Sequence, residues 1–147
     1  MEPAFFMQNP PHILIVDDEP HITCLLSKRL TKAGYSVATA FNGEEALLAA
    51  ADHPPDLVLS DYQMPDFDGL SLAKELFKRP GTEATPILML TARGHKIDDA
   101  TLEGTNIWEI IPKPYSGRQI EKLVEQALSP IGAEALPAVR NPFDRDA

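Results

Sequence analysis

Four short apolar runs in this chain each end at a polar residue that can take part in chemistry. The runs, each with the residues that follow it, are His12–Val16 with Asp17 and Asp18, Leu57–Ser60 with Asp61, Ile87–Leu90 with Thr91, and Ile110–Pro112 with Lys113. A continuous apolar run of this length is typical of a β-strand that is covered on both faces. Because ligands bind at the carboxyl ends of the strands in open α/β sheets, we expect these polar side chains to share one pocket.

Segments with helical spacing of apolar residues lie between these runs. Pro20 is well placed near a helix start and Gly34 supplies a stop signal; the apolar residues between them are Ile22, Leu25, Leu26, Leu30 and Ala33. Asn42, Asp68 and Ser116 are residue types that cap helices, and each precedes a further amphipathic segment. Residues 93–105 carry fewer apolar positions, and a helix is expected there as well.

Strands therefore alternate with helices along the whole central part of the chain. The expected strands are His12–Val16, Ser36–Ala40, Asp56–Ser60, Pro86–Leu90 and Ile107–Ile111. Five such β–α units predict an α/β fold with a doubly wound parallel five-stranded sheet, (βα)5, because right-handed crossovers place helices on both faces. We assign this domain to residues 11–128, a flexible leader to residues 1–10, and a flexible, proline-containing tail to residues 129–147.

The composition excludes several classes of protein. A formal net charge of −9 argues against direct nucleic-acid binding, which needs basic contacts to phosphate. No apolar run approaches the ~20 residues of a membrane span, and no secretory signal is evident. Cys24 is the single cysteine, so a reducing, cytoplasmic location is expected, with Cys24 itself on the apolar side of the first helix.

The polar segments at the strand ends resemble those of a known family. The matching pieces are Asp17-Asp18, Asp61-Tyr-Gln-Met-Pro-Asp-Phe-Asp-Gly69, Thr91-Ala92 and Lys113-Pro114. In order and spacing they are similar to the receiver domain of two-component response regulators, the group that includes the chemotaxis response regulator. The resemblance covers roughly residues 12–128 and implies a flavodoxin-like receiver fold.

The resemblance also implies a role for each matching residue. Asp61 corresponds to the phosphoacceptor, and Asp17 and Asp18 to the acidic pair that holds Mg²⁺ together with Asp61. The backbone carbonyl of Gln63 would complete the metal site, Thr91 would supply a hydroxyl to the phosphoryl group, and Lys113 would pair with that group. By the same resemblance the Lys113–Pro114 bond is expected to be cis, and the phosphoryl donor is a phosphohistidine on a partner histidine kinase or histidine phosphotransfer protein.

Elementary chemistry supports this assignment. Three converging carboxylates raise one another's pKa unless a cation relieves their repulsion, and Mg²⁺ with oxygen ligands does so. A carboxylate is a competent nucleophile toward phosphorus, and phosphoryl transfer depends mainly on positioning and charge neutralisation. We therefore expect a phosphoacceptor that signals to a downstream protein target, with homodimerisation on phosphorylation left open, and not an enzyme in the metabolic sense.

Two alternative readings stay open. The chain could be a receiver fragment of a longer regulator whose output domain is missing, or an interaction module that works without phosphorylation. A phosphatase with an aspartyl nucleophile is disfavoured because Asp61 is not followed by an Asp-x-Asp arrangement. Asp66 and Asp68 are assigned to a turn and a helix cap, and the histidines, which are His12, His21, His53 and His95, to ordinary surface or strand-edge positions.

One position departs from the family pattern. Family members usually carry Tyr or Phe three residues before the lysine, where this chain has Ile110. Strand alternation would place Trp108 on the same face as Ile110, about 6.6 Å farther from the pocket. The turn at Gly104 also comes early, so a shortened preceding helix and an extended fifth strand are expected, with activation acting through Thr91 and residues 93–104.

Overall fold

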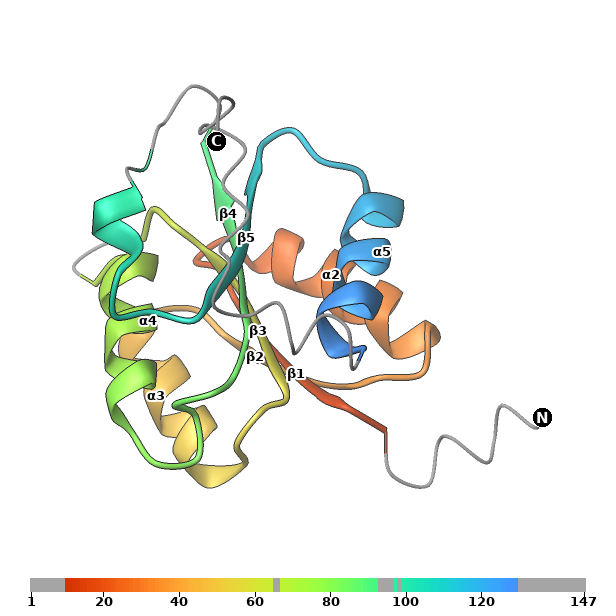
Figure 1. Cartoon of the computed structure of the whole chain (residues 1–147). Helices are drawn as coiled ribbons and strands as arrows, with labels where there is room; N and C mark the ends of the chain where they lie inside the picture. Colours follow the sequence, from red (N-terminus) through yellow and green to blue (C-terminus); the bar gives the residue numbers. More distant parts are fainter. Residues whose placement is uncertain (1–9, 65–66, 93–96, 98, 130–147) are drawn as a thin grey trace.

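A single parallel sheet of five strands forms the centre of the molecule (Figure 1). The computed structural model describes residues 10–64, 67–92, 97 and 99–129. The strands lie in the order β2-β1-β3-β4-β5. Their bounds are β1 His12–Val16, β2 Ser36–Ala40, β3 Leu57–Asp61, β4 Ile87–Thr91 and β5 Ile107–Pro112. This order is that of the flavodoxin-like doubly wound folds, so the predicted fold class is confirmed.

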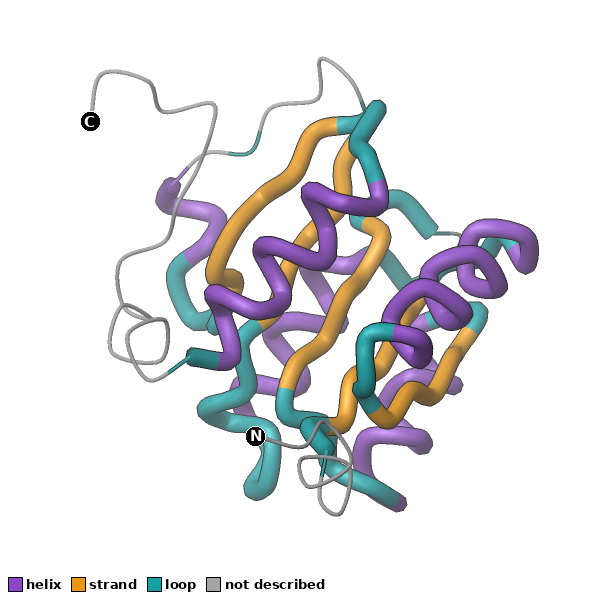
Figure 2. The backbone as a smooth tube through the Cα atoms, turned by 90° about the vertical axis from the view of Figure 1, so that its right-hand side faces the viewer, coloured by secondary structure: helices purple, strands orange, loops and turns teal. Residues whose placement is uncertain are grey.

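In the part of the chain that the structure describes, α-helices cover both faces of the sheet (Figures 1 and 2). They are α2 Pro20–Lys32, α3 Gly43–Asp52, α4 Gly69–Lys78 and α5 Gly117–Leu128. One core lies between the sheet and α3 with α4, and includes Val58, Leu72 and Leu76. The other lies between the sheet and α2 with α5, and includes Ile15, Leu30 and Val124. Strands covered on both faces explain why the sequence shows continuous apolar runs rather than alternation.

Three helices begin at the caps that the sequence predicts. The side chains of Asn42, Asp68 and Ser116 accept hydrogen bonds from the backbone N–H groups of Glu45, Ser71 and Gln119, at 2.7, 2.8 and 3.0 Å. Gly34, just after α2, has a φ of 107°, a conformation that glycine adopts without strain. Among the described residues, no helix is long and apolar enough to cross a membrane.

The apolar face of α2 is narrower than predicted. Its buried residues are Thr23, Leu26 and Leu30, whereas Leu25 is 63% exposed and Cys24 is also exposed. The expectations that Leu25, Ala33 and Cys24 belong to the buried side of this helix are therefore wrong. Successive helical residues differ by about 100°, so Leu25 points well away from Leu26. Thr23 is buried instead, and its hydroxyl donates to the carbonyl of Pro20 at 2.9 Å.

The segment before β5 contains a four-residue 3₁₀ helix, η1 Asp99–Leu102, in place of the α-helix expected over residues 93–105. Residues 93–96 and 98 of that expected helix lie outside the described residues. β5 is six residues long whereas the other strands have five, as the early turn at Gly104 predicts. The predicted leader and tail lie almost wholly outside the described residues.

A β-bulge in β5 reverses the expected side of Trp108. Ile87 pairs with Ile107, but the next residue of β4, Leu88, pairs with Glu109, so Trp108 is the inserted residue of the bulge. Trp108 joins the core under α2 and α5, while Ile110 joins the core under α3 and α4. The prediction that these two side chains share a face is wrong, because the inserted residue shifts the alternation by one.

Candidate functional site

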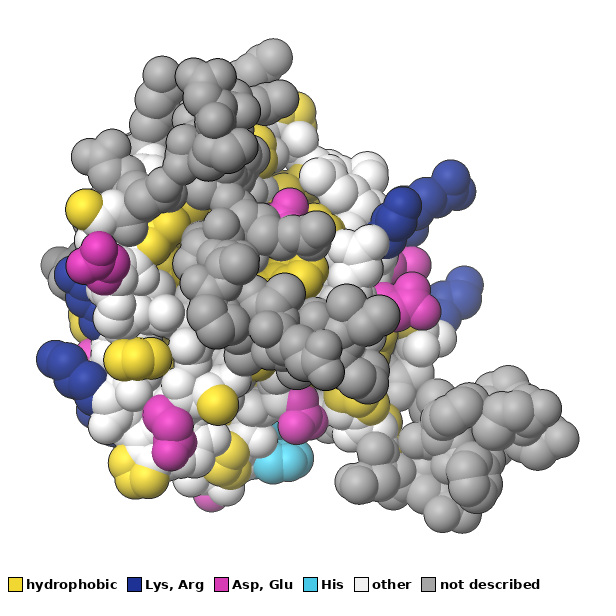
Figure 3. All heavy atoms as spheres, viewed as in Figure 1, with side chains coloured by type: hydrophobic (Ala, Val, Ile, Leu, Met, Phe, Trp, Pro, Cys, Tyr) yellow, Lys and Arg dark blue, Asp and Glu magenta, His cyan; other side chains and the backbone are white. Residues whose placement is uncertain are grey.

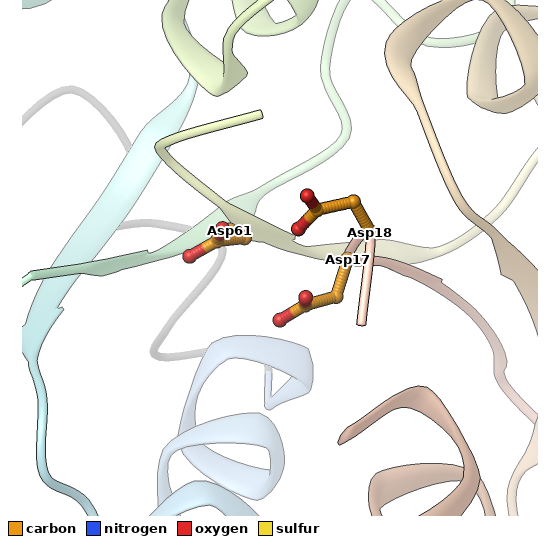
Figure 4. A group of neighbouring side chains, drawn as sticks. All are labelled: Asp17, Asp18 and Asp61. Carbon is orange, nitrogen blue, oxygen red and sulfur yellow. The ribbon is translucent and has the colours of Figure 1, made fainter. Parts of the chain in front are cut away.

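The acidic residues predicted to share a pocket meet at the carboxyl ends of β1 and β3. Asp17 and Asp18 directly follow β1, and Asp61 is the last residue of β3. One carboxylate oxygen from each of the three lies within 4.8 Å of the others, and Figure 4 shows the three side chains gathered at this edge. Asp17 and Asp61 are 1% and 5% exposed, whereas Asp18 faces solvent. Two carboxylates are thus withdrawn from water beside a third that remains accessible.

A threonine at the end of β4 and a lysine directly after β5 complete this edge. The Nζ of Lys113 donates to Oδ1 of Asp61 at 2.8 Å. Thr91, the last residue of β4, is fully buried, and its hydroxyl has no hydrogen-bond partner among the described residues. The backbone N–H of Lys113 donates to the carbonyl of Thr91 at 2.8 Å, which ties the ends of the two strands together. The Lys113–Pro114 bond is cis, as expected.

Burial and mutual repulsion shape the electrostatics of this edge. The pKa of Asp17 is raised from 3.8 to about 6, mainly by burial and to a smaller extent by the charge of nearby Asp61, although the backbone N–H of Glu19, which donates to Asp17 at 2.9 Å, lowers it. Burial also raises the pKa of Asp61, against the opposing effect of Lys113. For Lys113, burial lowers the pKa, but the hydrogen bond and the charge of Asp61 outweigh burial and leave the pKa raised. The edge carries more negative charge than the lysine alone neutralises.

These residues fit a divalent cation. One carboxylate oxygen of Asp17, Oδ2, is buried and has no hydrogen-bond partner among the described residues. Such an oxygen is costly to leave unpaired, and a hard cation is a suitable partner for a cluster of carboxylates. Asp17, Asp18 and Asp61 could hold the ion. Gln63, two residues after Asp61, is exposed in the loop between β3 and α4.

The other predicted positions have mixed outcomes. Asp68 caps α4 as expected, and Asp66 lies outside the described residues, as does His95. His21 and His53 are exposed, but His12 is buried, with its ring stacked on that of His53 at a centroid distance of 3.8 Å. Of the two positions expected for the histidines, surface or strand edge, His12 takes the second: it is the first residue of β1, and it is buried there.

Tyr115 is a neighbour of the site that the sequence analysis did not single out. Burial raises the pKa of its phenol, and Asp17 and Asp61 raise it further while Lys113 lowers it. Tyr115 and Lys113 line a groove of about 520 Å³ that continues along α2 past Glu19 and Leu26. The signal for Tyr115 was its position two residues after Lys113, beyond the Pro114 that turns the chain toward α5.

The strand order and the acidic edge together define a flavodoxin-like α/β domain with a carboxylate cluster suited to a cation. Comparison with known proteins agrees with this class. The model of the response regulator receiver domain matches residues 13–125. The chain is 39% identical over 133 residues to the "Probable transcriptional regulator ycf27" of Cyanidium caldarium, covering 90% of this chain and 51% of that protein.

Two further relatives support the same class. The alkaline phosphatase synthesis transcriptional regulatory protein PhoP of Bacillus subtilis is 39% identical over 116 residues, which is 79% of this chain and 48% of PhoP. The structure of chemotaxis response regulator CheY4 of Vibrio cholerae is 30% identical, with a TM-score of 0.75, and the match covers 82% of this chain and 100% of CheY4.

The chain belongs to the response regulator receiver domain family of two-component systems. It spans about half the length of the curated relatives described above. Receiver domains are regulatory phosphoacceptors that bind Mg²⁺ through an acidic aspartate cluster, and this chain has such a cluster.

Proposed function

We propose that Asp61 accepts a phosphoryl group from a phosphohistidine on a partner histidine kinase or histidine phosphotransfer protein. The observation that carries this proposal is the convergence of Asp17, Asp18 and Asp61 within 4.8 Å, with Lys113 bonded to Asp61. In the transfer, a carboxylate oxygen of Asp61 forms a bond to phosphorus. The bond from phosphorus to the imidazole nitrogen of the donor breaks, and the imidazole leaves.

Each neighbouring group has a task in this step. Asp17, Asp18 and Asp61, with the backbone carbonyl of Gln63, would hold Mg²⁺, which neutralises charge on the phosphoryl oxygens. Lys113, whose Nζ lies 2.8 Å from Oδ1 of Asp61, supplies a second positive charge beside the nucleophile. The buried Thr91 hydroxyl, free of a partner among the described residues, can donate to a phosphoryl oxygen.

The phosphorylated domain would then act by binding a downstream protein differently from the unphosphorylated one, and it would work in the cytoplasm. Direct nucleic-acid binding by this chain is not part of the proposal. The net charge is −9, and on the face shown in Figure 3 the described Lys and Arg side chains lie at two separate sides with Asp and Glu among them.

The relatives of about twice this length favour a second candidate, a receiver within a longer regulator. The length of the protein in its native cells tests that candidate.

Incubation with acetyl phosphate and Mg²⁺, followed by intact-mass measurement, tests the proposal. One phosphoryl group should be added, and hydroxylamine should remove it, because an aspartyl phosphate is an acyl phosphate. Asp61→Asn should remain unlabelled. Asp68→Asn is the matched control, because asparagine also caps a helix and should leave labelling unchanged. Full labelling of the Asp61→Asn protein would overturn the assignment.

A further inference from the structure

An aromatic side chain packs directly onto the first residue of α3. If Gly43 carried a Cβ atom, that atom would lie 1.7 Å from Cδ2 and 2.4 Å from Cε2 of Phe67. The edge of the ring therefore occupies the space of a side chain at position 43. Phe67 is half-buried and also packs against the core under α3 and α4, so both the core and the Gly43 backbone restrain the ring.

The two residues in contact belong to segments that lead to different parts of the acidic cluster. On the side of Gly43, the backbone N–H of Asp17 donates to the carbonyl of Ala40 at 3.1 Å, three residues before Gly43. Asn42, between them, caps α3. The position of the Asp17 backbone is therefore tied to the strand end that runs into Gly43.

On the side of Phe67, the link to Asp61 runs through the residues that follow Phe67. Asp68 caps α4, and the backbone N–H of Gly69 donates at 2.8 Å to the carbonyl of Tyr62, the residue after Asp61. Phe67 lies just before that cap. Contact between Phe67 and Gly43 thus joins the start of α4, which is bonded to the residue after Asp61, to the segment tied to Asp17.

We propose that Phe67, packed on Gly43, is a positioning residue that sets the spacing between the two acidic segments and thereby the affinity of the cluster for Mg²⁺. This inference rests on the proposed function, since it concerns the same cation site. Residues that orient metal ligands from outside commonly change metal affinity by 10- to 100-fold when they are altered. Because Phe67 acts through a segment rather than on a ligand directly, we expect a change near the low end, about tenfold.

Calorimetric titration of the whole chain with Mg²⁺, without any phosphodonor, tests the inference. Gly43→Ala forces the ring away and should weaken Mg²⁺ binding about tenfold. Phe67→Ala removes the ring from the other side and should also weaken binding. In the Phe67→Ala background the added Gly43→Ala change should have less than about a twofold effect, because the contact that it disturbs is already gone.

Two control variants separate positioning from general destabilisation. Glu44→Ala changes the next, exposed residue of α3 and should leave Mg²⁺ affinity unchanged. Val124→Ala removes core volume under α5 and should lower the melting temperature without changing Mg²⁺ affinity. Unchanged Mg²⁺ affinity in Phe67→Ala would overturn this inference but not the proposed function. So would an equal loss of affinity from Gly43→Ala in the unaltered protein and in the Phe67→Ala background. Absence of Mg²⁺ binding by the unaltered protein overturns the proposed cation site and this inference with it.

Discussion

Replacing Asp17 with asparagine should stabilise the metal-free protein at neutral pH. Asp17 is 1% exposed, and its burial, with help from Asp61, raises its pKa from 3.8 to about 6. The difference between a pKa of 3.8 and one of about 6 corresponds to about 3 kcal/mol by which folding disfavours the charged form. Asparagine keeps an oxygen that can accept the 2.9 Å hydrogen bond from the Glu19 N–H, so the substitution mainly removes the charge.

The sign of the pH dependence follows from the direction of this shift. The pKa of Asp17 in the folded protein lies above its unfolded value, so the cost of its charge is present in full above a pH of about 6 and vanishes as the pH falls toward 3.8. We expect Asp17→Asn to raise the free energy of unfolding by about 2–3 kcal/mol at pH 7.5 and by roughly half as much at pH 5. The gain at pH 7.5 corresponds to a melting temperature higher by roughly 6–12 °C in a domain of this size.

Thermal and guanidinium unfolding in the presence of a chelator, followed by far-ultraviolet circular dichroism, measures both quantities. Asp18→Asn is the matched control, since Asp18 is the adjacent carboxylate but faces solvent, and a smaller change is expected. Added Mg²⁺ should stabilise the unaltered protein, because it binds only the folded form, and should stabilise Asp17→Asn much less. The reasoning fails if Asp17→Asn brings no stabilisation at pH 7.5, or the same stabilisation at both pH values.

Two further predictions follow from single contacts. Lys113→Met leaves the buried carboxylate of Asp61 without its cation. In the absence of Mg²⁺ this change should lower the free energy of unfolding by about 1–2 kcal/mol. The loss is smaller than for a fully buried pair because the lysine side chain is 32% exposed. Lys113→Arg, which keeps the charge, should recover part of that loss in denaturant unfolding, and an equal loss in both variants would argue against a charge effect. Burial, and repulsion by the charge of the stacked His53, lower the pKa of His12 below 6.5. The folded protein therefore binds a proton at His12 less readily than the unfolded chain does, and the free energy of unfolding decreases as the pH falls below 6.5. His53→Asn should raise the pKa of His12 in an NMR titration and reduce the loss of stability between pH 7 and 5, and an unchanged titration would contradict this.

The sequence predicts best those features that depend on few neighbouring residues or on strand direction alone. Asn42, Asp68 and Ser116 cap helices because their side chains reach backbone N–H groups three residues ahead. The meeting of Asp17 with Asp61 follows from a single rule, that the carboxyl ends of parallel strands lie at one edge of the sheet. Neither inference needs knowledge of how the helices pack.

Features that depend on packing between distant segments could not be predicted in this way. Leu25 and Leu26 are equally apolar, and only the placement of α2 on the sheet decides that Leu26 is buried and Leu25 is not. The stacking of His12 on His53 joins residues 41 positions apart, from β1 and the end of α3. The bulge at Trp108 has no marker such as glycine in β5, so period-two alternation assigned its side chain to the wrong face.

That bulge bears on how phosphorylation would be transmitted from the acidic edge. Trp108 and Ile110 are 2% and 1% exposed and are packed into opposite cores, so β5 is held from both sides. Close-packed interiors resist displacement, and Ile110 has no ring that could alternate between a buried and an exposed position. The Thr91 hydroxyl, by contrast, has no partner among the described residues and lies at the end of β4, the strand beside β3, which ends at Asp61.

We therefore expect rearrangement to begin at Thr91 and to spread into the segment that follows it, up to Gly104, while β5 stays in place. Amide hydrogen exchange with and without beryllofluoride, a mimic of the phosphoryl group, distinguishes the two routes. Changed protection from Thr91 through η1, with Trp108 and Ile110 unaffected, is the expected result. Changes confined to Trp108 and Ile110 would show that β5 moves after all, and that double anchoring in the two cores does not prevent it.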